Sequence, residues 1–212
     1  MINIQQFTFN SFMVNSYLLW DESLEAIVID AACYDTNEQE EFSETVRKRH
    51  LKLTRNLTTH CHIDHVLGNE FIASTFGINP EYHQNSALFL NTMKEMGSSF
   101  GFKINKIPSL RRFLEDDETI AWGKSSLKVL YTPGHADGSV CFYSAVDGFV
   151  ITGDVLFKDT IGRTDLPTGD FDQLMNSIKT KLFSLPDSTV VYPGHGPETN
   201  IGYEKMNNPF IR

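Results

Sequence analysis

Short apolar runs and longer amphipathic stretches follow one another along the whole chain. The apolar runs predict strands, three within residues 2–30 and the others at residues 53–58, 119–122, 126–132, 139–144, 148–152 and 188–192. Apolar residues three or four positions apart predict helices over residues 37–50, 66–76, 83–96 and 171–185. In the last helix, Leu174, Ile178 and Leu182 form the buried stripe and Asp170 is the expected N-cap. This periodicity alone predicts a mixed α/β protein and no particular topology.

Composition limits the class of protein. At 212 residues, one domain over residues 1–212 is expected. A net charge of −9 argues against a nucleic-acid groove, which needs a basic face. The three cysteines (Cys33, Cys61 and Cys141) are unpatterned, so reduced thiols are expected. No leader peptide is evident, and no apolar run approaches the roughly 20 residues of a membrane helix, so a cytoplasmic protein away from membranes is expected.

The densest group of potential metal ligands lies in the stretch Thr-His-Cys-His-Ile-Asp-His, residues 59–65. Four of its side chains are metal-ligand types: His60, His62, Asp64 and His65. The first two histidines are two positions apart, so in an extended loop they point the same way and Cys61 points away. The other two residues lie where the chain turns toward the predicted helix. With only 7 histidines in the chain, this density favours a site for two neighbouring metal ions over chance.

Three more potential ligands follow predicted strands, each next to a glycine. They are His135 after Thr132-Pro133-Gly134, Asp154 after Thr152-Gly153, and His195 after Tyr192-Pro193-Gly194. Glycine permits the sharp turn that presents a side chain at the end of a sheet. One Pro-Gly-His turn is weak evidence, because most such turns bind nothing. Three strand-end ligands together with the first cluster indicate one composite site.

These motifs resemble those of the metallo-β-lactamase fold superfamily and, within it, the short glyoxalase II-like (hydroxyacylglutathione hydrolase-like) proteins. The resemblance covers nearly the whole chain, including residues 12–17, 161–167, 196–199 and 208–210. It implies an α/β (α+β) fold, a four-layer αββα sandwich with the ligands along one edge. It also implies that His60, His62 and His135 hold one metal ion. Asp64, His65 and His195 would then hold a second, with Asp154 bridging both.

Five imidazoles and two carboxylates suit zinc, with iron or manganese as alternatives. Two ions roughly 3.5–4 Å apart share a water and lower its pKa toward about 7, so a bridging hydroxide is the expected nucleophile. Asp64 and Asp154 are therefore the candidate catalytic carboxylates. The resemblance implies that the substrates are small-molecule thioesters of the S-acylglutathione (S-lactoylglutathione) type. Their thiolate leaving group, whose conjugate acid has a pKa of about 8.5, needs little help from a general acid.

Arg163 is the candidate substrate-binding residue. It lies nine positions after Asp154, where the family that the chain resembles places a cationic side chain near the substrate. A guanidinium can grip a carboxylate or a carbonyl of a glutathione-like group. The alternative is a structural salt bridge with Asp165 or Asp170.

Asp30 and residues 83–118 have roles that the sequence leaves more open. Asp30 ends the apolar run 26–29, and the resemblance suggests that it steadies a metal ligand or the ligand loop; otherwise it caps the next turn. Residues 83–118 contain no ligand pattern. In the fold that the chain resembles, this segment often borders the cleft, so Phe100 and Phe102 are candidates for lining a substrate channel.

Other functions within the superfamily remain as alternatives. A persulfide dioxygenase would use His60, His135 and Asp154 for a single iron, but residues 193–197 resemble the hydrolase branch. A β-lactamase is disfavoured by His65, which stands where many of those enzymes carry another residue. A hydrolase of another ester is also possible, whereas a binding module with a degenerate site conflicts with seven filled ligand positions. The metal, the acyl group, the carrier thiol and the oligomeric state stay open.

Overall fold

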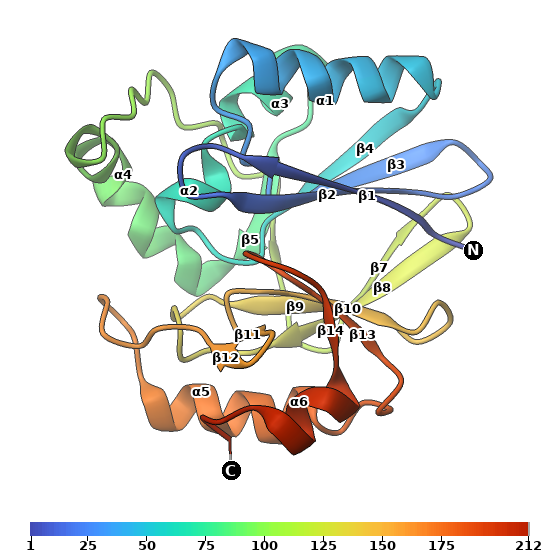
Figure 1. Ribbon diagram of the computed structural model, residues 1–212. Coiled ribbons are helices and arrows are strands. Elements are labelled where there is room, and N and C mark those ends of the chain that lie inside the picture. Colours follow the sequence, from blue (N-terminus) through green and yellow to red (C-terminus); the bar gives the residue numbers. More distant parts are fainter. Residues whose placement is uncertain (212) are drawn as a thin grey trace.

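In the computed structural model, which describes residues 1–211, two six-stranded sheets lie face to face (Figure 1). The first sheet has the order β1 (Asn3–Phe9), β2 (Val14–Trp20), β3 (Glu25–Ile29), β4 (Lys52–Leu57), β5 (Pro80–His83) and β6 (Arg112–Leu114). The second has the order β14 (Thr199–Asn200), β13 (Val190–Pro193), β10 (Phe149–Gly153), β9 (Val140–Ser144), β8 (Ser125–Tyr131) and β7 (Thr119–Trp122). A separate hairpin pairs β11 (Leu156–Phe157) with β12 (Thr160–Ile161).

Helices cover the outer face of each sheet (Figure 1). The first sheet is covered by α1 (Thr36–Lys48) and α3 (Asn69–Phe76), and the second by α5 (Phe171–Ser177), the π-helical turn η2 (Ile178–Leu182) and α6 (Ile201–Asn207). One end of the sandwich carries α2 (Ile63–Val66), the 3₁₀ turn η1 (Gln84–Ser86) and α4 (Ala87–Ser99). The expected four-layer αββα sandwich is therefore confirmed. Within residues 1–211, no helix has both the length and the apolar character that a membrane span requires.

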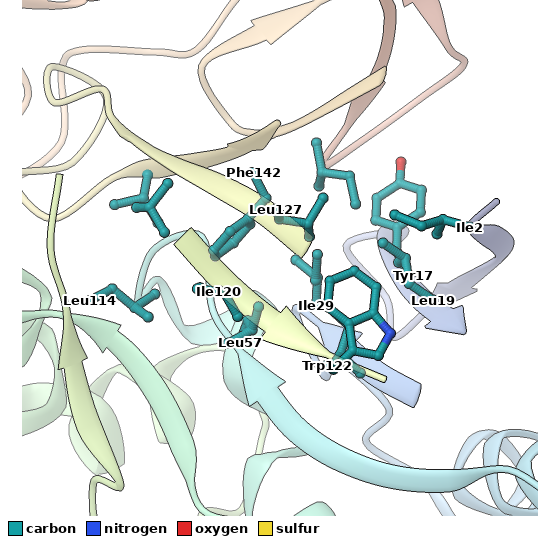
Figure 2. Close-up of a cluster of buried hydrophobic side chains, with 14 of the residues drawn as sticks. Ile2, Tyr17, Leu19, Ile29, Leu57, Leu114, Ile120, Trp122, Leu127 and Phe142 are labelled. Carbon is teal, nitrogen blue, oxygen red and sulfur yellow. The ribbon is translucent and has the colours of Figure 1, made fainter. Parts of the chain in front are cut away.

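The main core lies between the two sheets (Figure 2). Tyr17 and Ile29 of the first sheet pack there against Leu127 and Phe142 of the second, and all four are buried. Burial of each such side chain stabilises the fold by roughly 1.5–3 kcal/mol relative to exposure. The outer cores use Phe42 and Val46 on α1, and the stripe that the sequence predicted, Leu174, Ile178 and Leu182, on α5 and η2.

Three helices differ from the sequence-based expectation. The helix predicted over residues 83–96 is α4, residues 87–99, because His83 ends β5 and residues 84–86 form a 3₁₀ turn. The helix predicted over residues 66–76 is shorter: Val66 ends α2, and α3 begins only at Asn69, after Gly68. A Cβ at Gly68 would lie 2.7 Å from Cys33 Sγ and 2.8 Å from the carbonyl oxygen of Ala31, so the chain packs against the loop after β3 there. The helix predicted over residues 171–185 ends at Leu182, after a π-helical turn.

Glu81 on β5 is a fully buried carboxylate that forms ion pairs with three arginines, of which Arg111 is the most distant at 3.6 Å. It accepts hydrogen bonds from Arg55 at 2.9 and 2.6 Å, and Arg112 Nε lies 2.9 Å from it. Arg55, with a side chain only 15% exposed, would lose its partner if Glu81 were removed. We therefore expect Glu81→Ala to lower the free energy of unfolding by about 3–5 kcal/mol in urea denaturation. The control Glu44→Ala removes an exposed partner of Lys48 and should change the free energy of unfolding little. Equal effects of the two variants would contradict a structural role for the buried pair.

Candidate metal centre

The predicted ligands lie beyond the carboxyl ends of strands from both sheets. His60 and His62 follow β4, and Asp64 and His65 lie in α2. His135, Asp154 and His195 follow β8, β10 and β13, respectively. The pairs β3–β4 and β10–β13 are parallel, so within each sheet these strands end at the same edge. Binding sites of such sheets form at these converging strand ends.

The ligand atoms converge in three overlapping groups, and within each group they lie within 4.8 Å of one another. The groups are His60, His62 and His135; His60, His65 and Asp154; and Asp64, His65 and His195. Because His60 and His65 each belong to two groups, the seven side chains form one cluster. The structure therefore brings together every ligand candidate that the sequence indicated.

Asp154 lies at the centre of this cluster. Its Oδ1 is 3.3 Å from His65 Nε2, and its Oδ2 is 3.6 Å from His135 Nε2 and 3.5 Å from His195 Nε2. Burial alone would raise the pKa of Asp154, but the neighbouring histidines, His65 foremost, outweigh burial and hold it well below its usual range. The carboxylate is therefore ionised and faces histidines from all three groups.

The donor atoms fit metal ions. Within residues 1–211, His60 Nε2, His65 Nε2 and Asp154 Oδ1 are buried at the centre of the cluster without a hydrogen bond, although the last two lie 3.3 Å apart as an ion pair. Leaving a buried polar atom unpaired costs about 1–3 kcal/mol, so such atoms call for an explanation. A divalent cation would satisfy all three. Cys61 is buried and belongs to none of the three groups, so the donor set contains nitrogen and oxygen only.

The histidines of the first group are neutral at pH 7. Burial depresses the pKa of His60 well below its usual value, and the neighbouring His65 and His62 add to the effect. Burial and the nearby His135 lower the pKa of His62 to about 4, and burial also lowers the pKa of His135. A neutral imidazole offers the lone pair that a metal ligand needs.

The two histidines of the third group, His65 and His195, instead have raised pKa values. Burial disfavours charge on His65, but the carboxylates of Asp154, Asp64 and Asp30 outweigh burial and raise its pKa well above the usual value. For His195, hydrogen bonds to Asp154 and Asp64 likewise outweigh burial and raise the pKa to about 9. In the absence of metal, both imidazoles are therefore doubly protonated and positively charged at pH 7.

Metal binding is consequently expected to release protons. A cation must displace the protons of His65 and His195, whose pKa values are raised, so metal affinity should increase with pH up to about 9. Calorimetry of metal binding to the apoprotein at pH 7, in buffers of different ionisation enthalpy, should show release of about two protons per chain. Binding without proton release would contradict these charge states.

Asp30 touches both a ligand and the ligand loop. Its Oδ2 lies 2.9 Å from His65 Nδ1 and accepts the hydroxyl of Thr59 at 2.7 Å, while Oδ1 accepts the amide of Thr59 at 2.7 Å. The same hydroxyl oxygen lies 3.0 Å from His60 Nδ1. These contacts engage the Nδ1 atoms of two histidines and leave their Nε2 atoms facing the cluster. Thr59 was not singled out from the sequence, although it directly precedes the first histidine.

Arg163 touches the cluster through its backbone. Its carbonyl oxygen accepts a hydrogen bond from His135 Nδ1 at 2.8 Å, which turns His135 Nε2 toward the cluster, 3.0 Å from His62 Nδ1. The guanidinium makes two hydrogen bonds of 2.7 Å to Asp165, and its side chain is 61% exposed. The salt bridge considered from the sequence is thus present with Asp165, and an exposed pair of this kind contributes little to stability.

Asn15 joins the first sheet to the loop that bears His195. Its side-chain amide donates to the carbonyl oxygens of Pro193 at 3.0 Å and Gly196 at 2.9 Å, and its backbone N–H donates to the carbonyl oxygen of Gly194 at 2.7 Å. The residue belongs to the segment 12–17 that carried the resemblance, but nothing in its local pattern indicated this role. These bonds fix the loop that carries His195 against β2 of the first sheet.

Comparisons with known proteins match almost the whole chain. A model of the metallo-beta-lactamase superfamily matches residues 10–195, which include all seven ligand candidates. The hydroxyacylglutathione hydrolase GloC of Haemophilus influenzae is 34% identical over 212 residues, covering 99% of this chain and 98% of that protein.

Two crystal structures superpose over nearly the full chain. TTHA1623 in a di-iron-bound form has a TM-score of 0.87 at 32% identity and covers 97% of this chain and 99% of its own. The BLEG-1 B3 metallo-beta-lactamase has a TM-score of 0.86 at 30% identity and covers 100% of this chain and 99% of its own. The chain therefore belongs to the metallo-β-lactamase superfamily.

Proposed function

We propose that this superfamily hydrolase cleaves thioesters of the S-acylglutathione type with two divalent metal ions. The observation that carries the metal chemistry is the single cluster of seven donors around Asp154. The substrate class is supported by the relative named as a hydroxyacylglutathione hydrolase, which matches this chain over almost its whole length.

Each metal ion has three ligands of its own in this proposal. His60, His62 and His135 would hold one ion, and Asp64, His65 and His195 would hold the other. Asp154 would be a ligand of both. When bound, the two ions acidify water and place positive charge where the oxyanion of the substrate develops. The donor set suits zinc, and the di-iron form of the similar TTHA1623 supports iron as the alternative.

The chain itself orients these ligands. Asp30, Thr59 and the carbonyl oxygen of Arg163 engage the Nδ1 atoms of His65, His60 and His135, so that the Nε2 atoms face the reaction centre. A departing thiolate needs little proton donation, because its conjugate acid has a pKa of about 8.5. That leaving group suits a site whose titratable side chains are committed to binding metal.

Arg163 is proposed to exchange Asp165 for a carboxylate of the substrate. The exchange costs little, because both side chains are exposed. Arg163→Ala should raise KM for S-lactoylglutathione about tenfold with kcat nearly unchanged, since a charged hydrogen bond contributes roughly 1.5–3 kcal/mol. The control Asp165→Asn frees the guanidinium and should not raise KM. An unchanged KM in Arg163→Ala would show that the guanidinium pairs with Asp165 and does not bind the substrate.

One assay with three substrates tests the proposed function. We expect purified protein to release thiol from S-lactoylglutathione without oxygen, and to lose this activity on chelation of metal. β-Lactam hydrolysis is the second candidate, favoured by the similarity to BLEG-1. Turnover of a chromogenic β-lactam without thioester turnover would promote it. Oxygen uptake with glutathione persulfide, again without thioester turnover, would instead identify a dioxygenase.

A further inference from the structure

The turn between β1 and β2, residues 10–13, connects two members of the third ligand group. At its start, the side-chain amide of Asn10 donates a hydrogen bond of 3.0 Å to the carbonyl oxygen of Asp64 in α2. Directly after the turn, Val14 forms an isolated antiparallel bridge with His195. The two attached residues approach each other, with 3.4 Å between Asp64 Oδ2 and His195 Nε2. One short turn therefore spans two candidate ligands of the same metal ion.

The hydrogen bond from Asn10 satisfies a backbone group that α2 itself leaves unpaired. This helix is only 4 residues long, and the last four carbonyl groups of an α-helix have no partner within it. The regular partner of the Asp64 carbonyl would be the N–H of Gly68, four positions later. That N–H donates instead to the carbonyl oxygen of Ala31 at 2.8 Å. Asn10 therefore takes the place of the missing helical donor and holds α2 against the turn.

Asn10 is itself held in one conformation. Its Nδ2 also donates to the carbonyl oxygen of Ala32 at 3.1 Å, and its Oδ1 accepts the N–H of Phe12 at 2.9 Å. Its backbone N–H donates to Glu38 Oε1 at 2.5 Å. Its φ of 53° lies in the left-handed region, which asparagine adopts more readily than most residues. Both side-chain polar atoms are engaged, so the bond to Asp64 comes from a fixed donor.

We propose that Asn10 is a positioning residue for one metal ion: it holds α2 so that Asp64 faces His195. This inference rests on the proposed two-metal centre and adds a residue outside the donor set. The ion of His60, His62 and His135 should depend on Asn10 much less. The side chains of those three ligands make their hydrogen bonds to Thr59, Arg163 and each other. Loss of a residue that orients a ligand typically weakens metal binding about 10–100-fold.

The first test measures the two dissociation constants for Zn²⁺ in the apoprotein by competition with a chromophoric chelator. Asn10→Asp keeps the size of the side chain, its left-handed backbone and the acceptor for Phe12, but it cannot donate to Asp64. Asn10→Gly removes the side chain without backbone strain. We expect both variants to weaken one Zn²⁺ ion about tenfold and to leave the other near its wild-type affinity.

Asn200→Ala is the control for a general loss of stability. Asn200 Oδ1 accepts the backbone N–H of Tyr203 at 2.8 Å and so caps α6, and Asn200 belongs to none of the ligand groups. Loss of this cap should lower the melting temperature and change neither dissociation constant. If Asn10 were merely structural, its variants would show the same pattern as this control.

Two further variants assign the effect to one metal site. His195→Ala removes a candidate ligand of the ion that Asn10 is proposed to serve, so adding Asn10→Asp should not weaken the remaining Zn²⁺ further. His62→Ala removes a candidate ligand of the other ion, and adding Asn10→Asp there should still weaken the remaining Zn²⁺ about tenfold. Equal effects in the two backgrounds would overturn the assignment of Asn10 to one site.

The outcomes separate this inference from the proposed function. If wild-type protein binds two ions and hydrolyses thioesters, but the Asn10 variants bind both ions as tightly, the positioning role fails and the proposed function stands. If the variants weaken one ion as expected but no thioester is hydrolysed, the proposed substrate fails and the role of Asn10 stands. Binding of a single ion by wild-type protein would contradict both.

Discussion

Asp154→Asn is expected to remove metal from both halves of the cluster and to reduce thioester hydrolysis by about 10³-fold or more. The side chain keeps its size, but the amide presents one oxygen and one nitrogen in place of two anionic oxygens. Asp154 is the residue that approaches His65, His135 and His195. Loss of its charge therefore weakens both metal sites at once, and loss of one electrostatic contribution at a reaction centre alone costs about 10²–10³-fold in kcat.

The measurements are metal content by elemental analysis and kcat/KM for S-lactoylglutathione. Asp159→Asn is a matched control, because Asp159 follows Asp154 by five positions but lies outside the cluster. Asparagine also tolerates its positive φ of 61°. This control should retain its metal and its activity. If Asp154→Asn kept both metal ions, Asp154 would not be a shared ligand.

The second large effect is expected from Gly194→Ala. A Cβ at this position would lie 2.2 Å from Asp154 Oδ1 and 2.8 Å from His65 Cε1. One of these side chains must move, and a displacement of about 1 Å at a reaction centre costs on the order of 10²-fold in rate. We therefore expect Gly194→Ala to lose at least about 10²-fold in kcat/KM and to bind metal more weakly, with the fold retained by circular dichroism.

Gly196→Ala separates this steric effect from backbone strain. Gly196 has a positive φ of 73°, but nothing lies within 4 Å of an added Cβ. An alanine there costs about 1–2 kcal/mol of stability through its left-handed conformation. It should lower the melting temperature and leave metal binding close to wild type. Similar metal loss in both glycine variants would mean that loop strain, not the clash with Asp154, disrupts the centre.

Much of the fold could be predicted because its signals are local. The stripe of Leu174, Ile178 and Leu182 marked the helical layer over the second sheet, and it packs there as expected. The glycine turns placed single ligands at strand ends, and strand ends on one edge converge whatever the detailed topology. For that reason all seven ligand candidates meet in the structure, although they come from four separate segments of the chain.

The features that the sequence did not predict depend on contacts between residues distant in sequence. The break between α2 and α3 arises because Gly68 packs on Ala31 and Cys33, which no pattern around residue 68 reveals. The hydrogen bond from His65 to Asp30 spans 35 positions, and both interpretations of Asp30 fitted its local sequence. Likewise, Arg163 had Asp165 and Asp170 within reach along the chain, and only the folded loop selects Asp165.

The central claim is that seven side chains form one centre for two metal ions that share Asp154. The most direct measurement is the number of metal ions per chain in fully active protein, by native mass spectrometry of protein purified without added metal. The account predicts two ions per chain, with thioester hydrolysis rising in proportion to the doubly loaded fraction. Full activity with a single ion per chain would contradict it.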